Sequence, residues 1–304
     1  MSILVAALIA LQAAGTAPST AEAVAALDAD PALWRTVDPE DLMVMEFGGK
    51  RVLIELAPHF APHTVDNIRK LVRAGYYDST AIVRVQDNYV VQWGAEEEDV
   101  QSGDTGAAPN RGDALDRVPG ELSRPRGDDF TTIDQHDVYA PTVGFSRGFA
   151  AAQDGQTQWL THCYGAVGVG RADDVDGADG SSLYVVTGAP PRHLDLNIAL
   201  AGRVLDGMPA FLALPAGSDQ MGFYAAGEAK PPLTRVMFAA DLPPAEREAV
   251  RVEVARTDTP AFLDYVGARA NRARDGWFVR SAGAVDLCNI PVPVRFPGRE
   301  EKPD

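Results

Sequence analysis

The sequence has little positive charge. Its 304 residues contain 27 Lys and Arg against 43 Asp and Glu, which gives a formal net charge of −16 at pH 7. A protein of this charge repels the phosphate backbone of nucleic acids, and no cluster of Lys or Arg offsets the repulsion. We therefore expect no nucleic-acid partner, and the simplest reason for the acidic surplus is solubility.

Cysteine is also scarce, with only Cys163 and Cys288 in the chain. Neither these two residues nor the five His residues have the spacing of a metal site, so we expect no metal. In an oxidising compartment the cysteines could pair and close a long loop, which stabilises a fold by about 4 kcal/mol in the chain-entropy model. Two unpaired buried thiols are equally compatible with the sequence, because separation along the chain says nothing about distance in space.

Long apolar runs are missing as well. The apolar run at residues 3–11 is too short to span a bilayer comfortably. Small and polar residues follow it, with Ala21-Glu22-Ala23 as a small-x-small cleavage pattern, so residues 1–23 resemble a secretory signal peptide. The run is preceded by no Lys or Arg, and the alternative is an N-terminal amphipathic helix. A signal peptide predicts a periplasmic or secreted protein without a membrane span in the mature chain.

The remaining composition is typical of a soluble globular protein, with 46% hydrophobic and 23% charged residues. The 28 Gly and 22 Pro favour a loop-rich, mainly β architecture. Residues 24–41 predict a helical lead-in. Two apolar runs within residues 42–56 flank Gly48-Gly49-Lys50 and predict a β-hairpin, where the sheet begins.

A helix of about three turns is predicted next. Pro62 suits its first turn and Gly75 offers a left-handed stop. The apolar residues between them fall on one face that would pack on the sheet: Val65, Ile68, Leu71 and Val72. Two short strands are then predicted on either side of the turn residues 86–88.

The stretch from about residue 95 to residue 162 has no firm periodicity, and it contains an acidic run, several Gly and four Pro. It is either a functional insertion or a mobile loop. Strand patterns return in YGAVGVGRA, SSLYVVTG and LNIALAGRVLDGM, and again in TRVMFAADL and VRVEVAR. We expect a barrel-like domain over residues 42–255 and a C-terminal extension over 256–304, which holds the helix-like AFLDYVGARANRAR.

Several strings resemble the cyclophilin family of prolyl isomerases. VLIELAPHFAPHTVDNIRKLVRAGYYDST, AIVRV and YVVQWG follow one another as the family's APxTVxNF-, GYYDGT-, FHRV- and FMIQGGD-like strings do. GSSLYVV and HLDLNIALAGRV are similar to its later GSQFFI- and WLDGKHVVFGKV-like strings. The resemblance covers residues 42–94 and 163–208. It implies a closed eight-stranded antiparallel β-barrel capped by two helices, with the site on the outer face of the barrel.

The resemblance also implies roles for individual residues. Arg84 matches the family's catalytic arginine, and Gln92 matches the glutamine that orients it and bonds the substrate backbone. Four apolar-bodied residues match the proline pocket: Tyr89, Val90, Tyr184 and Leu194. His193 occupies the place of a Trp that contributes to cyclosporin binding, so we expect poor sensitivity to that drug. The alternatives are a salt-bridged strand arginine at 84, a solvated glutamine at 92 and ordinary barrel packing for the pocket residues.

Several positions depart from the family pattern. Ile82-Val83 stand in place of Phe-His, and Trp93 replaces a Gly, so that Trp93 either obstructs the groove or adds a stacking surface. At three further positions the family's polar groove residues are replaced: Asn by Arg171, Gln by Ser182 and His by Ile198. Each lost hydrogen-bonding group costs roughly 1 kcal/mol, so peptide binding should be weaker or differently selective.

The resemblance implies a peptidyl-prolyl cis-trans isomerase that acts on proline-containing polypeptides outside the cytoplasm and needs no cofactor. Two alternatives remain. The chain is a proline-peptide binding or scaffold module that has lost turnover, or the insertion and the extension dock a partner. The sequence leaves the oligomeric state and the natural substrate open.

Overall fold

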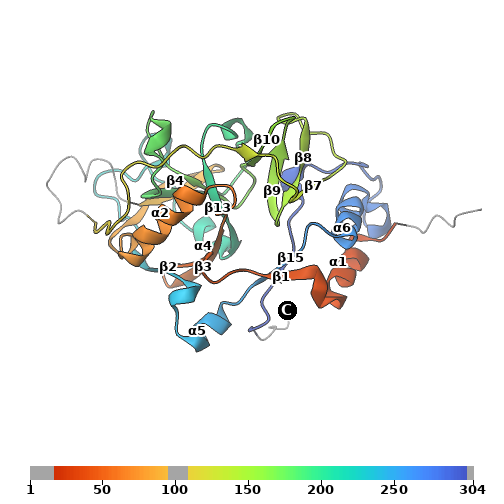
Figure 1. Cartoon of the computed structure of the whole chain (residues 1–304), viewed down its shortest axis with the longest axis horizontal. Helices are drawn as coiled ribbons and strands as arrows, with labels where there is room; N and C mark the ends of the chain where they lie inside the picture. The colour runs from red at the N-terminus through yellow and green to blue at the C-terminus, as the bar shows by residue number, and fades with distance from the viewer. Residues whose placement is uncertain (1–16, 95–108, 300–304) are drawn as a thin grey trace, which may run out of the picture.

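The computed structural model describes residues 17–94 and 109–299 (Figure 1). Its largest sheet has eight strands, paired antiparallel in the order β14-β2-β3-β13-β11-β12-β5-β4. The strands are β2 (Leu42–Phe47), β3 (Lys50–Leu56), β4 (Ala81–Gln86), β5 (Val90–Gly94), β11 (Ala166–Val169), β12 (Ser182–Val186), β13 (Leu200–Asp206) and β14 (Leu233–Phe238). Gly48 and Gly49, both at positive φ, make the predicted turn between β2 and β3.

The two edge strands of this sheet approach each other. The Ile82 amide donates to the Pro231 carbonyl at 2.9 Å, and the Leu233 amide donates to the Thr80 carbonyl at 3.0 Å. These bonds join β4 to the chain that enters β14, so the sheet is nearly closed. The predicted eight-stranded antiparallel barrel is confirmed.

Two helices contribute buried side chains to the interior of the barrel. The helix α2 (Pro62–Arg73) ends before Gly75, which has a φ of +74°, as predicted. It packs its predicted apolar face into the core: Val65, Ile68, Leu71 and Val72. The short helix α4 (Met208–Leu212) adds Phe211, whose ring centroid lies 5.2 Å from that of Phe47.

The predicted insertion contains a second antiparallel sheet, with strands in the order β6-β10-β9-β8-β7. They are β6 (Arg124–Pro125), β7 (Phe130–Thr132), β8 (Thr142–Ser146), β9 (Phe149–Gln153) and β10 (Thr157–Leu160). We predicted no strands here, because short strands of Ala, Gly and polar residues give weak alternation. The Asp154-Gly155 pair between β9 and β10 is the hairpin signal that could have revealed them. Residues 95–108 of the insertion lie outside the described residues.

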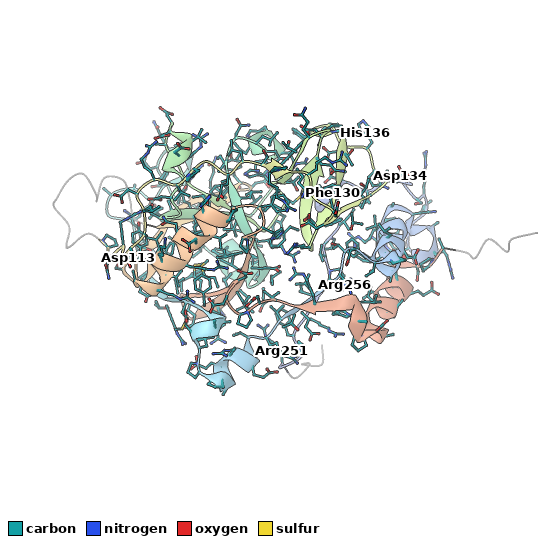
Figure 2. All side chains as sticks on the ribbon, viewed as in Figure 1. Asp113, Phe130, Asp134, His136, Arg251 and Arg256 are labelled. Atoms are coloured by element: carbon teal, nitrogen blue, oxygen red, sulfur yellow. A yellow bond between two sulfur atoms is a disulfide. The ribbon has the colours of Figure 1, made fainter. Side chains whose placement is uncertain are left out.

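The second sheet packs against the barrel on one side. Phe149 and Ala151 of β9 and Leu160 of β10 share a buried cluster with residues of the barrel's outer face. Phe130, labelled in Figure 2, packs against the same cluster. The inserted sheet therefore covers part of the surface on which we expected the site.

The two ends of the described chain meet beside the second sheet (Figure 1). A third sheet joins β1 (Trp34–Thr36), β15 (Glu253–Ala255) and β16 (Val294–Arg295). The helix α1 (Thr20–Ala29) packs on α6 (Pro260–Ala270), where the helix-like pattern was predicted, and α5 (Pro244–Ala249) precedes β15. The predicted lead-in is thus helical only in its first part, because residues 34–36 form a strand.

The start of α1 overlaps the predicted signal peptide. Ser19 caps the helix, with its hydroxyl accepting from the Glu22 amide, and Ala23 is buried. Residues 1–16 of the predicted signal lie outside the described residues. Within residues 17–94 and 109–299, no helix is both long and apolar enough to cross a bilayer.

Cys163 and Cys288 form a disulfide, with their Cα atoms 4.9 Å apart. The bond joins the segment after β10 to the short 3-10 turn Leu287–Asn289. Of the two possibilities that the sequence left open, pairing is therefore the one found. The disulfide ties the C-terminal extension to the segment that directly follows the insertion.

Candidate functional site

The alternation of side chains along three neighbouring strands creates the candidate site. In β5, Val91 and Trp93 point into the barrel core, so Val90 and Gln92 point outward. Arg84 of β4 and Tyr184 of β12 are both paired in register with Gln92. The three side chains therefore form one row across the outer face of the barrel.

Arg84 is half-buried, and its guanidinium is held by three neutral oxygens. Nε donates to the Met221 carbonyl at 2.7 Å, Nη1 donates to Gln92 Oε1 at 3.4 Å, and Nη2 donates to Gln86 Oε1. Within residues 17–94 and 109–299 it has no carboxylate partner, so no salt bridge of Arg84 is found in the described part of the chain. Its positive charge is available to a ligand.

Two aromatic rings flank the guanidinium of Arg84. Its central carbon lies 5.7 Å from the ring centroid of Tyr89 and 5.3 Å from that of Phe223. Such cation–π contacts partly replace lost hydration. Burial lowers the pKa of Arg84 from its usual value, but a guanidinium stays protonated in proteins. The arginine is therefore a fixed, charged donor.

An apolar cluster on the outer face adjoins Arg84. Val90 is 2% exposed and Tyr184 is 5% exposed, and both belong to this cluster, with Tyr89 and Ile198 packed against it. The cluster is separate from the barrel interior, and the inserted sheet packs on it, so these residues are buried between the barrel and the insertion. The structure thus brings together Tyr89, Val90 and Tyr184 of the predicted pocket.

The fourth predicted pocket residue, Leu194, lies in the 3-10 turn η4 (Arg192–Leu194), as does His193. Leu194 is half-buried, and it is not one of the members of the outer apolar cluster. His193 is exposed, and its carbonyl accepts from Asn197 Nδ2 at 3.2 Å. An exposed imidazole offers less apolar surface than the indole that the family pattern has there.

Trp93 neither obstructs the groove nor offers a stacking surface, so both expectations for it were wrong. It is 0% exposed inside the barrel, where its ring stacks on Phe211 with centroids 5.7 Å apart. The reason is the pleat of β5, because the residue after the outward Gln92 must point inward. Ile82 also lies in the core, and the register of β4 shifts between Ile82 and Arg84.

The remaining departures keep polar contacts of their own. Ser182 Oγ accepts from Gln92 Nε2 at 2.9 Å, so it helps to fix the glutamine that faces Arg84. Arg171 donates through Nη2 to the Asn197 carbonyl at 2.9 Å and through Nη1 to the Ala172 carbonyl at 2.7 Å. The arginine therefore braces two loops beside the groove, and its donors are occupied by the protein itself.

Sequence reasoning missed three residues around Arg84. Gln86 lies two residues along the same strand, so alternation alone could have placed it beside Arg84. Met221 and Phe223 come from the loop after α4, outside the strings that carry the resemblance. Met221 is exposed with a φ of +55°, which is strained for a residue with a side chain, and no sequence pattern signals it.

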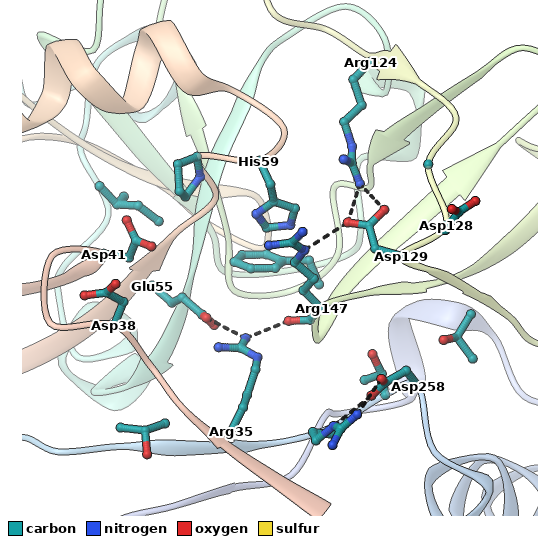
Figure 3. A pocket seen from close by; sticks show the side chains of 18 residues that line it. Arg35, Asp38, Asp41, Glu55, His59, Arg124, Asp128, Asp129, Arg147 and Asp258 are labelled. Atoms are coloured by element: carbon teal, nitrogen blue, oxygen red, sulfur yellow. Dashed lines mark hydrogen bonds and ion pairs between the residues drawn. The ribbon is translucent and has the colours of Figure 1, made fainter.

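A cavity of about 880 Å³ lies elsewhere, among the barrel, the second sheet and the third sheet (Figure 3). Its charged side chains are largely paired with one another. Arg35 lies 2.5 Å from Glu55, and Arg124 lies 2.6 Å from Asp129. None of the predicted site residues lines this cavity. No group of three or more His, Cys, Asp or Glu among the residues described could hold a metal ion.

Comparison with known proteins places the chain in a family. The model of the family described as cyclophilin type peptidyl-prolyl cis-trans isomerase/CLD matches residues 42–234. The crystal structure of cyclophilin AquaCyp293 from Hirschia baltica is similar, with a TM-score of 0.65 and 26% identity over 89% of this chain and 96% of that one. That coverage extends beyond the residues of the family model, so this chain shares more than the barrel with AquaCyp293.

Curated relatives match a shorter segment. Probable peptidyl-prolyl cis-trans isomerases of Brucella suis and Brucella melitensis are each 39% identical over 57 residues, which is 19% of this chain and 29% of each relative. The family model spans well over half of the chain, and the barrel and its strand order agree with it. The chain therefore belongs to the cyclophilin-type peptidyl-prolyl cis-trans isomerase family.

Proposed function

We propose that the protein is an active peptidyl-prolyl cis-trans isomerase whose catalysis depends on Arg84. The observation that carries the proposal is the guanidinium of Arg84, which is fixed on the outer face of the barrel beside an apolar cluster and has only neutral partners in the described chain. A fixed guanidinium beside apolar side chains suits a prolyl peptide, because the N–H groups can bind the imide nitrogen or carbonyl while the apolar side chains contact the ring.

The chemistry needs no nucleophile, acid or metal. Amide resonance sets a barrier of about 20 kcal/mol to rotation about an X-Pro bond. In the twisted state the imide nitrogen becomes pyramidal and gains a lone pair, which a guanidinium N–H can bind. Because the planar states lack that lone pair, the interaction favours the transition state over both isomers.

Arg84 has donors left for this task. A guanidinium carries five N–H groups, and three of them are used by Met221, Gln92 and Gln86. Two N–H groups remain for the imide nitrogen or the adjoining carbonyl of a substrate. The acceptors of the other three N–H groups hold the guanidinium in place, so it needs little reorganisation when the peptide twists.

A protease-coupled assay on Ala-Pro peptides tests the proposal. Arg84→Ala should lose most of the catalysed rate. Arg51→Ala should keep it, because Arg51 is an exposed arginine on β3, which β14 and β2 separate from β4 around the nearly closed sheet. Equal rates for the unmodified protein and Arg84→Ala would reject catalysis at this site.

The alternative of a proline-peptide binding module without turnover also has a specific observation in its favour. The inserted sheet packs on the outer apolar cluster and leaves Val90 and Tyr184 almost fully buried. A groove narrowed in this way could bind a peptide and restrict its rotation. Ala-Pro peptides can be titrated and followed by NMR. Saturable binding together with no exchange broadening between the isomers would favour this alternative.

We further propose that the protein acts on polypeptides outside the cytoplasm, in the periplasm or after secretion. The signal-like pattern of residues 1–23 and the Cys163–Cys288 disulfide support this location, because disulfides persist in oxidising compartments. Subcellular fractionation followed by N-terminal sequencing tests it. Recovery of the full-length chain with Met1 from the cytoplasm would contradict the proposal.

A further inference from the structure

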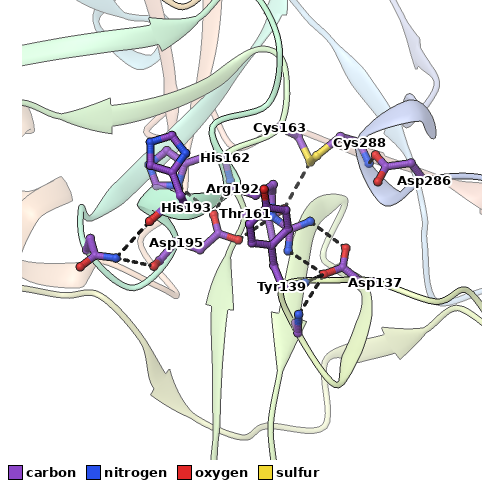
Figure 4. A network of polar contacts seen from close by, with 12 residues as sticks. Asp137, Tyr139, Thr161, His162, Cys163, Arg192, His193, Asp195, Asp286 and Cys288 are labelled. Carbon is purple, nitrogen blue, oxygen red and sulfur yellow. Dashed lines mark hydrogen bonds and ion pairs between the residues drawn. A yellow bond between two sulfur atoms is a disulfide. The ribbon is translucent and has the colours of Figure 1, made fainter.

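A buried series of polar side chains connects the pocket residue Tyr184 to the 3-10 turn η4. The Tyr184 hydroxyl lies 2.8 Å from His162 Nε2, and His162 Nδ1 lies 2.9 Å from Asp195 Oδ1. His162 is 0% exposed and belongs to the segment that joins the second sheet to the barrel. Figure 4 shows His162, Asp195 and Arg192 lying side by side.

Both ring nitrogens of His162 take part in hydrogen bonds, one with Asp195 and one with Tyr184. The backbone amide of His162 also donates to Asp195 Oδ1 at 2.9 Å, so this carboxylate oxygen receives two donors from one residue. His162 Nδ1 faces this carboxylate and donates to it, and Nε2 shares a hydrogen bond with the Tyr184 hydroxyl. Burial raises the pKa of Tyr184 well above its usual value, so the hydroxyl keeps its proton.

The same network holds the turn that carries Leu194. Asp195 Oδ2 accepts from Arg192 Nε at 2.5 Å, and Arg192 Nη1 donates to Asp137 Oδ2 at 2.9 Å. Asp137 lies in the inserted segment between β7 and β8, and its side chain is buried. The insertion therefore contacts Tyr184 through His162 and η4 through Asp137, and only the first of these contacts requires the Tyr184 hydroxyl.

We propose that His162 and Asp195 are positioning residues for the proline pocket, and that they act through Tyr184. They hold the Tyr184 ring in one orientation before a peptide binds, so that the wall facing the prolyl ring is already formed. This inference rests on the proposed function. Because Arg84 lies in a separate set of contacts, loss of the network weakens peptide binding and leaves the twisting step unchanged.

The test uses Tyr184→Phe, His162→Gln and the double variant, with isomerisation kinetics on Ala-Pro peptides. We expect each single variant to raise KM by about threefold to tenfold while kcat stays the same, as for an interaction made equally in the ground and transition states. The double variant should match the singles, because both changes break one connection.

Tyr265→Phe is the matched control. Tyr265 is 3% exposed, and its hydroxyl donates to the Pro291 carbonyl at 2.8 Å. The variant therefore removes a comparable buried hydroxyl away from the site. It should lower the melting temperature without raising KM. If His162→Gln does not fold, the KM of Tyr184→Phe can still be compared with that of the control, because this variant keeps the aromatic ring.

Three results would overturn the inference. One is an unchanged KM in Tyr184→Phe or His162→Gln with a stability loss like that of Tyr265→Phe, which assigns the network to stability alone. The second is additive effects in the double variant, which means that His162 does not act through Tyr184. The third is an unmodified protein that neither isomerises nor binds Ala-Pro peptides, in which case the proposed function itself fails and the inference with it.

Discussion

Each hydrogen-bond acceptor around Arg84 in the described part of the chain is neutral. A buried arginine with a carboxylate partner would stabilise the twisted imide less, since the ion pair satisfies the charge internally. Here two glutamines and a carbonyl orient the fork, and the rings of Tyr89 and Phe223 flank it. Holding a cation in this half-buried position costs desolvation free energy. A functional role therefore explains Arg84 better than a structural one.

His193 gives a prediction about inhibition. Because the exposed imidazole at this position has little apolar surface to offer, cyclosporin should inhibit the protein poorly, and His193→Trp should tighten inhibition. Peptide isomerisation measured over a range of drug concentrations checks both. Inhibition of the unmodified protein at nanomolar drug would contradict this expectation.

Trp93 gives a prediction about stability. Its ring fills the barrel core against Phe211, so Trp93→Ala should lower the free energy of unfolding by about 3–5 kcal/mol through lost burial and a residual cavity. Urea unfolding measures the change. Trp277 is 82% exposed and serves as the control, because Trp277→Ala should change the free energy by no more than about 0.5 kcal/mol. A similar effect of both variants would show that Trp93 does not pack as described.

Among the elements, the barrel and α2 could be predicted from the sequence because each has strong periodicity. The apolar face from Val65 to Val72 and the Gly48-Gly49 turn are local signals, and their structures depend little on distant contacts. Arg84 and Gln92 could also be placed, because the first block of the resemblance runs in register through both strands. Their hydrogen-bonded pairing across β4 and β5 follows from that register.

The second sheet and the rest of the site could not be predicted, for a different reason. The insertion's strands are short, and their side chains are buried against the barrel on one face and against α1 and α6 on the other, contacts that come from distant parts of the sequence. Met221 and Phe223 reach Arg84 from about 137 residues further along the chain, as the Arg84–Met221 hydrogen bond indicates. Trp93 was misplaced because the comparison of strings considered its neighbour Gln92 but not the face to which each residue points.

The disulfide gives a prediction at the scale of elements. Because Cys163–Cys288 closes a loop of sequence separation 125 and joins the C-terminal extension to the segment that directly follows the insertion, changing both cysteines to Ser should cost about 2–5 kcal/mol of folding free energy. Thermal unfolding with and without a reductant measures this. A reductant should lower the melting temperature of the unmodified protein and leave that of the double variant unchanged. Equal sensitivity of the two would contradict the prediction.

For the whole molecule, the packing of three sheets around the charged cavity predicts a dependence of stability on pH. Burial lowers the pKa of His59 from 6.5 to about 3, and the nearby Arg147 and Arg124 add to the effect. The unfolded chain takes up a proton as the pH falls below about 6.5, whereas the folded protein does not until about 3. Stability linked to His59 is therefore full above pH 6.5 and is lost progressively between these values.

Urea midpoints at pH 7 and pH 5 measure this loss. The unmodified protein should lose stability over the interval, and His59→Gln should lose less, because glutamine does not titrate. Asp129 lies near His59. Burial acts to raise its pKa, but the charge and hydrogen bonds of Arg124, together with hydrogen bonds from Gln158 and Ser146, lower the pKa overall, so its own contribution is lost only at more acidic pH. Equal losses for the two proteins would rule out His59 as the source.

The whole molecule also combines two tasks that one experiment can separate. The apolar cluster and its supporting network would bind the peptide, whereas Arg84 would lower the barrier to rotation. NMR exchange spectroscopy on an Ala-Pro peptide gives both the isomerisation rate and the dissociation constant for the unmodified protein and for Arg84→Gln. We predict a rate about 10²–10³ lower in the variant, with the dissociation constant nearly unchanged. An undiminished exchange rate in Arg84→Gln would contradict the account.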